Sequence, residues 1–457
     1  MYAEDTIAAI ATPAGYGGIG IIRLSGPQCV TIADTIFATQ RPAREWTAHH
    51  LYRGHVLAAA GTVLDDGLAV LMRAPHSYTG EDVLELHCHG SPAVLRQALA
   101  RALSCGARTA LPGEFTKRAF LNGRLDLAQA EAVIELVRAR TGAAAQLAAH
   151  QLAGHLSTQL DALRTRLIRV KAFLEAQIDF SEEDFEVPPG ALADSIDICI
   201  SVVSSLINTY SHGKVIRDGV RVAIIGKPNV GKSSLLNALL GEERAIVTPI
   251  AGTTRDTIEE TADFDGVPVV LTDTAGLRQM EHADPIERMG MQRTDGTIAE
   301  SQLALAVLDA SAPADAEDLA VLDAARRLPA VLVLNKIDVA SHVFDAAAIA
   351  DRLPVVRVSA TQHLGLAELR RTVVAAVTHG QPMEHTHPVV TNARHYAALT
   401  QAAASLDLAR RSIAERQPPD LVAVDVQDAI DLVGSITGIV TGEDVLDRIF
   451  SEFCIGK

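Results

Sequence analysis

A phosphate-binding loop is the clearest chemical pattern in this sequence. Residues 226–233 read Gly-Lys-Pro-Asn-Val-Gly-Lys-Ser and directly follow an apolar run, residues 221–225. The two glycines let backbone N–H groups approach phosphate oxygens, and the helix expected to follow adds positive potential at its N-terminus. Lys232 can neutralise the charge of β- and γ-phosphates, and Ser233 can offer a hydroxyl to Mg²⁺. The order of strand, loop and helix predicts a nucleoside triphosphate site.

Two later motifs indicate which nucleotide is bound. Asp273 ends an apolar run 41 residues after Lys232 (273 − 232 = 41), and its carboxylate can hold the Mg²⁺ shell. Residues 335–338, Asn-Lys-Ile-Asp, follow another apolar run. Asp338 can accept two hydrogen bonds from the N1–H and amino groups of guanine, a donor pair that adenine lacks. These motifs predict GTP as the ligand, in preference to ATP.

The residues expected to contact GTP come from five stretches of the chain. Two of them, Ser359 and Ala360, would complete the base pocket through their backbone amides. The full set is Asn229, Val230, Gly231, Lys232, Ser233, Ser234, Thr248, Thr253, Thr254, Asp273, Thr274, Ala275, Gly276, Asn335, Lys336, Asp338, Ser359 and Ala360.

Residues 246–256 resemble the first switch of small GTPases, with Thr254 as the second Mg²⁺ hydroxyl besides Ser233. Leu277 follows the Asp-Thr-Ala-Gly motif, where many signalling GTPases use glutamine, and leucine cannot orient a water molecule. Either hydrolysis is slow and unassisted, or help comes from an arginine, a downstream carboxylate such as Glu287, or a bound cation. The amide of Asn229 could coordinate a monovalent cation, or it could be satisfied by the backbone.

Composition excludes several classes of protein. The chain has 457 residues, 48% hydrophobic and 21% charged, which suits about three soluble domains. Its net charge of −16 (40 − 56) argues against a surface that follows nucleic acid throughout. Five scattered cysteines indicate a reduced compartment. Without an uninterrupted run of about 18 apolar residues or a basic leader, we expect a soluble, unexported chain that crosses no membrane.

The pattern along the chain predicts an α/β domain inserted into a helical one. Residues 1–120 show strands and helices of a compact α+β domain, which begins with two strand-like runs within residues 5–24 that are expected to form a hairpin or close strand pair. Residues 121–213 show helical spacing: apolar residues recur from Leu156 to Ile178 as a helix-bundle seam, and a second helix is expected from about Ala191 to Tyr210. Residues 214–379 alternate strands and helices, which is typical of a parallel sheet covered on both faces. Residues 380–457 return to helical texture. We expect these four ranges to be the domain segments.

These motifs, together with the opening residues 11–26 and the ending Phe-Cys-Ile-Gly-Lys at 453–457, closely resemble the MnmE (TrmE) family of tRNA-modification GTPases. The likeness runs through the whole chain. It implies an N-terminal folate-binding and dimerising domain, a helical-bundle domain of two segments, and an inserted P-loop GTPase domain of Ras-like α/β fold. It also implies that the protein, with a flavin-containing (FAD) partner, builds a 5-aminomethyl or 5-carboxymethylaminomethyl group on the wobble uridine of tRNA. A folate one-carbon unit would supply the methylene carbon.

The resemblance also implies roles for single residues. A K⁺ site, formed as two GTPase domains pair across a homodimer, would use Asn229, Thr248, Ile250 and Thr253. Glu287 would position the attacking water. Reduced folate, as the 5-formyl or 5,10-methylene form of tetrahydrofolate, would contact Arg23, Glu85, Arg124 and Lys457, although Arg124 stands where a lysine is expected. Cys454 would act near the folate or the uridine. Each folate residue also has a purely structural reading, as a surface or strand-end side chain.

The resemblance further implies a cytoplasmic heterotetramer or larger complex with the flavin protein. Two other functions remain open: a GTP-dependent ribosome-assembly factor that binds RNA without modifying it, and a folate aminomethyltransferase with an idle phosphate loop. For tRNA, basic residues on the helical segments could make local contacts or could line a solvated helix face. These residues are Arg164, Arg166, Arg169, Lys171, Arg410 and Arg411.

Overall fold

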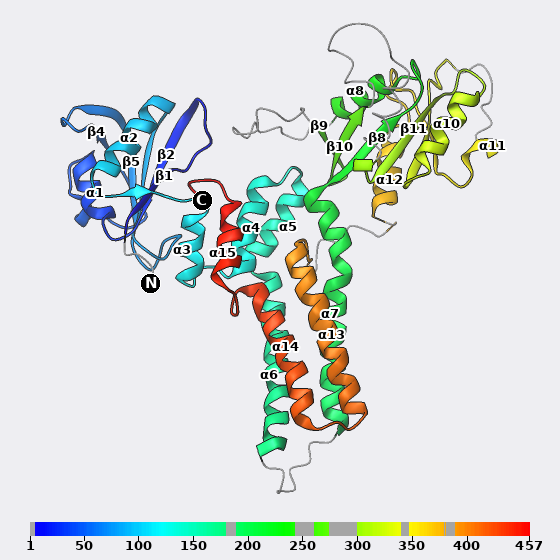
Figure 1. Cartoon of the computed structure of the whole chain (residues 1–457). Helices are drawn as coiled ribbons and strands as arrows, with labels where there is room; N and C mark the ends of the chain where they lie inside the picture. The colour runs from blue at the N-terminus through cyan, green and yellow to red at the C-terminus, as the bar shows by residue number, and fades with distance from the viewer. Residues whose placement is uncertain are drawn as a thin grey trace. The chain divides into compact units, whose positions relative to one another are not determined.

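The structure is a computed structural model. It describes residues 5–179, 189–242, 260–273, 299–339, 347–378, 380 and 389–457. The chain forms two compact units (Figure 1). Unit 1 consists of Met1–Ile134 and Asp431–Lys457, and unit 2 consists of Glu135–Ile430. The four expected domain segments remain a prediction.

Unit 1 is built on a seven-stranded sheet in the order β3-β4-β5-β6-β2-β1-β7. The expected hairpin near the N-terminus is confirmed, because β1 and β2 pair in antiparallel fashion. The strands are β1 Ile7–Ile10, β2 Gly17–Ser25, β3 Phe37–Ala38, β4 Leu51–Leu57, β5 Val63–Met72, β6 Val83–Gly90 and β7 Arg108–Thr109.

Helices cover one face of this sheet. Alternate residues of β2 and β6, among them Ile22 and Leu84, pack in one core with Ile32 of α1 (Cys29–Ile36) and Ala98 of α2 (Pro92–Ser104). The residues between them therefore point to the opposite face, since successive strand side chains alternate. The remaining helices of unit 1 include the short η1 (Ala43–Glu45), α3 (Glu114–Leu121) and α15 (Glu443–Ser451), and α3 packs with α15.

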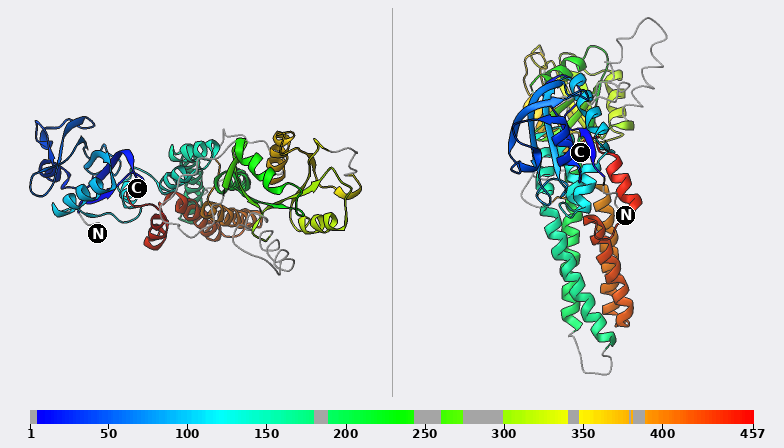
Figure 2. Two further views of the ribbon diagram at one scale, coloured as in Figure 1. Left: turned by 90° about the horizontal axis from the view of Figure 1, so that it is seen from above. Right: turned by 90° about the vertical axis from the view of Figure 1, so that its left-hand side faces the viewer.

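Unit 2 contains long helices and a second sheet. Its helical part includes α5 (Gly142–Leu152), α6 (His155–Asp179), α7 (Pro189–Asp218) and α13 (Ala393–Ala414), with α7 packed along α13 and α6 (Figures 1 and 2). Two further helices, α4 (Leu127–Arg138) and α14 (Pro419–Thr437), run across the limits of the units.

The expected leucine seam of α6 is confirmed from Leu156 to Leu174, but its last member, Ile178, is 41% exposed. The helix α7 extends past the expected end at Tyr210 to Asp218. Gly213 does not stop it, because this glycine permits close packing: a Cβ there would lie 2.4 Å from the carbonyl oxygen of Val390.

The residues 190–218 of α7 form a helix that is long and apolar enough to span a membrane by length and composition, with a mean hydropathy of 1.6 over an 18-residue window. The core helix of a soluble protein passes the same test, so this criterion alone is weak evidence. The helix packs along α13 and α6 through buried residues such as Cys199 and Val203.

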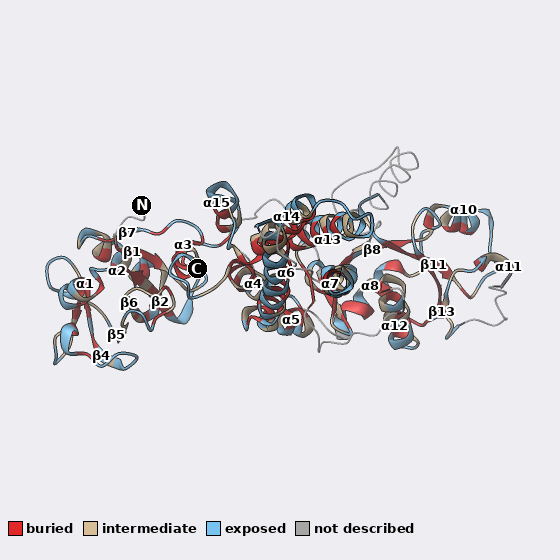
Figure 3. Cartoon of the chain, turned by 90° about the horizontal axis from the view of Figure 1, so that it is seen from below, coloured by how far each residue is buried: buried red, intermediate tan, exposed pale blue. Residues whose placement is uncertain are grey.

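The second sheet confirms the expected α/β fold. Its order is β13-β12-β11-β8-β10-β9, and every neighbouring pair is parallel except β9 with β10. Helices α8 (Lys232–Glu242) and α12 (Leu366–Val377) cover one face, while α10 (Ala316–Ala325) and the short α11 (Ala347–Ala350) cover the other. The central strands are buried on both faces (Figure 3). The strands are β8 Val220–Ile225, β9 Glu260–Phe264, β10 Val267–Asp273, β11 Leu303–Asp309, β12 Ala330–Asn335 and β13 Val355–Arg357.

Candidate functional site

The phosphate loop lies between the end of β8 and the start of α8, as the sequence predicts. Gly231 has φ +94° and Asn229 has φ +66°, both in the left-handed region. The Lys232 ammonium group, 8% exposed, donates hydrogen bonds to the carbonyl oxygens of Gly226 and Lys227, each at 2.8 Å. The lysine is thus held folded over the loop, where its charge is directed at the space that phosphates would fill.

Asn335 connects this loop with the base-reading segments. It is 2% exposed, its Nδ2 donates to the carbonyl oxygen of Val230 at 2.9 Å, and its Oδ1 accepts from the amide of Ala360 at 3.1 Å. A Cβ at position 231 would lie 2.3 Å from the Asn335 Nδ2, so only glycine fits there. One buried amide at the end of β12 therefore joins the segments that follow β8 and β13.

The two amides expected to complete the base pocket are already bonded within the protein. Ala360 donates to Asn335, and Ser359 donates to the carbonyl oxygen of Leu364 at 3.0 Å. Asp338 is exposed three residues beyond β12, so its carboxylate faces solvent.

Two lysines form ion pairs around this site that the sequence did not predict. Lys336, with φ +64°, donates to Asp309 Oδ2 at 2.6 Å. Burial pushes the pKa of Asp309 up, but the hydrogen bonds from Lys336 and Ser311 outweigh it and hold that pKa below its usual value. Lys227 of the loop pairs with Asp315 and Asp318, at the start of α10, at 2.7 and 2.8 Å. The register that places Asp309 opposite Asn335 was the available signal for the first pair.

Several predicted residues cannot be placed. Asp273 ends β10 with its backbone opposite Ile224 of β8, two residues before the loop begins. Among the residues that the structure describes, no group of three or more His, Cys, Asp or Glu could hold a metal ion. The remaining predicted contacts lie outside the described residues: Thr248, Ile250, Thr253, Thr254, Thr274, Ala275, Gly276 and Glu287.

A second cluster lies in unit 1, on the sheet face opposite α1 and α2. Arg23 of β2 is directly opposite Glu85 of β6, and its Nε lies 2.8 Å from Glu85 Oε1. The Arg23 guanidinium also lies over the rings of Tyr78 and Phe115, 5.8 and 5.9 Å from their centroids. His87 Nε2 lies 3.3 Å from Glu85 Oε2. The hydrogen bond from His87, followed by the charge of Arg23, keeps the pKa of Glu85 below its usual value despite burial.

The C-terminal tail is docked beside this cluster. Gly456 has φ +98°, and a Cβ there would lie 2.5 Å from the carbonyl oxygen of Ile10 in β1. Phe453 is buried, and the carbonyl oxygen of Cys454 accepts from the amide of Gly113 at 3.4 Å. Cys454 itself is exposed and is a free cysteine.

Lys457, the last residue, belongs to the same cluster electrostatically. Burial and then the positive charge of Arg23 lower its pKa, while Cys454 and Glu85 act in the opposite direction. The structure thus brings together Arg23, Glu85, Cys454 and Lys457. Arg124 is exposed, and its described hydrogen bond is to the carbonyl oxygen of Ser77 at 3.1 Å, next to the Tyr78 that contacts Arg23.

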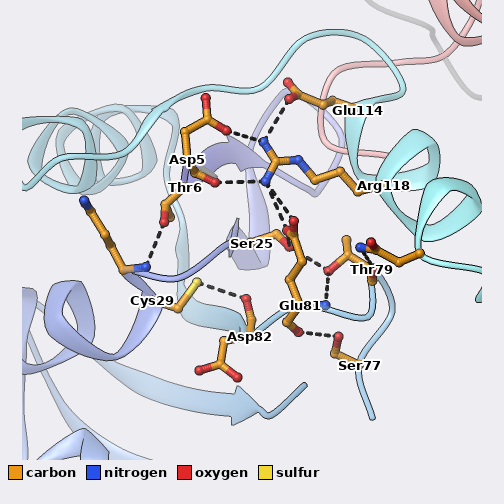
Figure 4. Close-up of polar contacts among 12 residues, drawn as sticks. Asp5, Thr6, Ser25, Cys29, Ser77, Thr79, Glu81, Asp82, Glu114 and Arg118 are labelled. Atoms are coloured by element: carbon orange, nitrogen blue, oxygen red, sulfur yellow. Dashed lines mark hydrogen bonds and ion pairs between the residues drawn. The ribbon is translucent and has the colours of Figure 1, made fainter. Parts of the chain in front are cut away.

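A buried arginine near this cluster pairs with several carboxylates, and the sequence did not predict this network (Figure 4). Arg118 of α3 is 1% exposed and contacts three carboxylates: Asp5 at 2.6 Å, and Glu81 and Glu114 at 3.1 Å each. Glu81 in turn accepts a hydrogen bond from Ser25, two residues after Arg23, at 2.7 Å. An arginine on the buried side of a helix that also buries Phe115 was the signal that could have revealed it.

Two other features carry none of the predicted residues of these sites. A cavity of about 960 Å³ beside β4 is lined by Arg41, His50, Tyr52, Arg53, His55 and Asp66, among others. On the helices of unit 2, two of the basic residues considered for tRNA have acidic partners: Lys171 pairs with Glu175 at 3.1 Å and Arg410 with Asp407 at 3.2 Å. These pairs suit a solvated helix face.

Comparison with known proteins gives matches over the whole chain. Residues 127–454 match the family model described as the MnmE helical domain, and residues 6–124 match the model described as the GTP-binding protein TrmE N-terminus. The tRNA modification GTPase MnmE of Chloroflexus aurantiacus is 47% identical over 463 residues, which is 99% of this chain and 100% of that protein. The protein of the same name from Moorella thermoacetica shows the same identity and coverage.

Among solved structures, Aquifex aeolicus Era bound to GDP·AlF4⁻ is similar at 26% identity and a TM-score of 0.28, covering 41% of this chain and 67% of that one. The family matches are far more extensive. Because they cover nearly every residue, at 47% identity to full-length relatives, this chain belongs to the MnmE (TrmE) family of tRNA modification GTPases.

Proposed function

We propose that this chain hydrolyses GTP and uses the cycle to drive modification of the wobble uridine of tRNA. The observation that carries the nucleotide part is the Asn335 bridge, which holds the phosphate loop and the guanine-reading segment in one fixed relation. A site in which these two parts are pre-positioned loses little freedom when a nucleotide binds both. Family membership supports the tRNA part.

The described residues have distinct tasks in this proposal. Lys232 exchanges its two loop carbonyls for the β- and γ-phosphate oxygens, and Ser233 directs its hydroxyl at Mg²⁺. Mg²⁺ supplies charge neutralisation between the phosphates. Asp338, exposed beyond β12, accepts the two guanine N–H groups, while Lys336 is held beside it by Asp309.

A potassium ion beside the phosphates is part of the proposal. Asn229 is exposed and has a left-handed backbone, so its amide oxygen is free to turn toward a cation near the loop. The other expected ligands, Thr248, Ile250 and Thr253, come from the family resemblance. The ion would supply the positive charge that an arginine supplies in other GTPases, when the GTPase parts of two chains pair.

The cluster in unit 1 fits a reduced folate. Its carboxylate, Glu85, has a lowered pKa and can accept N–H groups of a pterin ring as an ion, while Arg23 and Lys457 can face the carboxylates of the folate tail. The folate supplies the one-carbon unit when bound. Cys454, exposed next to Lys457, is placed at the edge of this cluster.

The assembly part of the proposal rests on the family. It comprises a homodimer in the cytoplasm that joins an FAD-containing partner protein in a heterotetramer or larger complex and acts on tRNA. A ribosome-assembly role without modification chemistry gains no support from unit 1, where the folate cluster lies.

The test of the nucleotide site is Asp338→Asn. The change removes the charged acceptor of two guanine N–H groups, so GTP affinity should fall on the order of tenfold to a hundredfold. Affinity for XTP should rise, because xanthine has a carbonyl where guanine has its amino group. Calorimetric titration with GTP, ATP and XTP in the presence of Mg²⁺ measures both changes.

A matched control is Asp323→Asn, an equally exposed carboxylate that pairs with Arg326 on α10. It should leave all three affinities unchanged. Tight binding of ATP by the unaltered protein, or unchanged GTP affinity in the Asp338 variant, would refute this assignment of the site.

A further inference from the structure

The β9–β10 hairpin runs from the edge of the GTPase sheet to the phosphate loop. β10 pairs with β8 from Val269 opposite Val220 to Asp273 opposite Ile224, so its C-terminal end lies beside the start of the phosphate loop. At the other end the chain reverses through Asp265 and Gly266, both with positive φ, and the amide of Gly266 donates to Asp263.

The turn of this hairpin is held by two residues from the helical part of unit 2. Thr141 Oγ1 donates to the carbonyl oxygen of Gly266 at 2.9 Å, over a sequence separation of 125 residues. Arg140 Nη1 lies 3.4 Å from Thr261 Oγ1 in β9. Thr141 is 6% exposed and is also the N-cap of α5, since its Oγ1 accepts from the amide of Ala144 at 3.2 Å. One buried hydroxyl therefore serves a helix start and a strand turn together.

The helix that Thr141 caps, α5, is packed against α7. Ala144 and Leu147 of α5 pack against Ile216 near the end of α7. Where α7 leads into β8, Gly219 approaches the hairpin so closely that a Cβ would lie 2.3 Å from the carbonyl oxygen of Pro268. The start of β10 is thus held from two sides by helical segments that are themselves packed together.

We propose that Arg140 and Thr141 are positioning residues that couple the GTP site to the helical part of the chain through the β9–β10 hairpin. The inference rests on the proposed GTPase function and names how that site is regulated. Because β10 continues directly from Gly266 and pairs with β8 from Val269 to Asp273, a shift at Gly266 is passed to Asp273, the expected Mg²⁺-side residue. Coupling of this kind is reciprocal, so loss of the contact alters nucleotide preference as well as the response of the helices.

Substitutions at position 141 separate the two tasks of the hydroxyl. Thr141→Ser keeps both the cap and the donor. Thr141→Asp keeps the N-cap acceptor, at which aspartate is favoured, but places a carboxylate against the Gly266 carbonyl oxygen and so breaks the contact with the hairpin. Arg140→Gln weakens the second contact without touching the cap.

Two measurements on the full chain report the coupling. The first is the ratio of the dissociation constants for GDP and a non-hydrolysable GTP analogue, followed with fluorescent nucleotides. We expect this ratio to change about fivefold or more in Thr141→Asp, by less in Arg140→Gln, and not in Thr141→Ser. The second is hydrogen exchange at the first turn of α5, around Ala144, with GDP and with the GTP analogue. Protection there should depend on the nucleotide in the unaltered protein and in Thr141→Ser, and should not in Thr141→Asp.

The matched control is Asn392→Asp, which alters the N-cap of α13 in the same unit; the described hydrogen bond of Asn392 is to the amide of Arg394. It should leave both readouts unchanged. If Thr141→Asp and Arg140→Gln bind both nucleotides with the original ratio, the inference is wrong while the GTPase proposal stands. If the unaltered protein binds neither nucleotide, the proposed function itself fails.

Discussion

Asn335 and Arg118 are both buried polar residues, yet the surroundings give them different roles. Asn335 is neutral and meets one donor and one acceptor from the backbone, which suits a fixed bridge between loops. Arg118 is charged and needs compensation, which three carboxylates provide. At the scale of single residues, the polar groups that surround the two sites are thus as important as the groups that would touch a ligand.

The first prediction at this scale concerns stability. Replacing Arg118 by Met removes the common partner of Asp5, Glu81 and Glu114 and leaves their charges uncompensated. The free energy of unfolding should fall by about 3–5 kcal/mol, the usual cost of breaking a buried ion pair. Urea denaturation at pH 7, followed by circular dichroism, measures it.

The same variant should change the acid dependence. Burial raises the pKa of Asp5 and of Glu114, but the hydrogen bonds of Arg108 and Arg118 outweigh it, so both folded pKa values lie below the ordinary 3.8 and 4.5. Lowered carboxyl pKa values add stability above the unfolded pKa, and that stability is lost as the pH falls through the folded values. As the pH falls, the free energy of unfolding should therefore decrease steeply in the original protein and less steeply in Arg118→Met.

The control for both measurements is Arg118→Lys, which keeps the positive charge but not the forked geometry of the guanidinium. Its loss of unfolding free energy should be smaller than that of Arg118→Met. A stability within about 0.5 kcal/mol of the original in the Met variant would show that this network contributes little.

At the scale of elements, the C-terminal tail behaves as part of the unit 1 sheet. The helix α15 places Phe450 and Phe453 in contact, with their ring centroids 5.5 Å apart, and the chain then turns at Gly456 against β1. The free movement that chain ends often show is replaced here by close packing. Lys457 reaches Arg23 and Glu85 only because of this turn.

The element-scale prediction is that Gly456→Ala displaces the tail. The methyl group would meet the carbonyl oxygen of Ile10, and φ +98° is strained for any residue with a Cβ. Binding of 5-formyl-tetrahydrofolate, measured by calorimetry, should weaken on the order of tenfold or more, since Lys457 leaves the cluster. GTP affinity should not change.

Gly442→Ala is a matched control, because Gly442 has an ordinary φ of −75° and open space around the position of a Cβ. It should bind the folate normally. Equal folate binding by the Gly456 variant would show that the docked tail is not part of the ligand site.

At the scale of the whole chain, the two ends are folded into one unit. Residues 431–457 belong with residues 1–134, while residues 135–430 form the other unit. The Arg23–Glu85–Lys457 cluster therefore combines residues from two segments that lie far apart in the sequence. A net charge of −16 also means that any contact with tRNA phosphate must come from local basic groups.

The prediction at this scale concerns pairing of chains. If K⁺ supplies catalytic charge as two GTPase parts meet, hydrolysis should be at least about tenfold faster in KCl than in NaCl at equal ionic strength. Phosphate release at saturating GTP measures the rate.

Light scattering should give a mass of about twice 48.4 kDa. Lys232→Ala should abolish hydrolysis in both salts, and equal rates in the two salts would remove the cation from the mechanism.

Much of the fold was predictable from the sequence. Two strand-like runs separated by a Gly/Pro segment indicated the β1–β2 hairpin, and helical spacing indicated the α6 seam, because one face of that helix is buried. The alternation of strand-like and helical segments indicated the parallel sheet. The predicted end of α7 at Tyr210 was wrong, since the helix continues to Asp218 through Gly213, which permits close packing against Val390.

The sequence by itself determined that the chain has the phosphate-loop pattern and an α/β fold, and it predicted a guanine-reading motif and an inserted domain, because these depend on a few residues at fixed spacing and on the order of apolar runs. Only the tertiary structure decided which side chains support the two sites. Arg118 meets Asp5 across 113 residues and Thr141 meets Gly266 across 125. Such pairs leave no periodic signal, because the geometry that brings them together is set by the packing of whole helices and sheets.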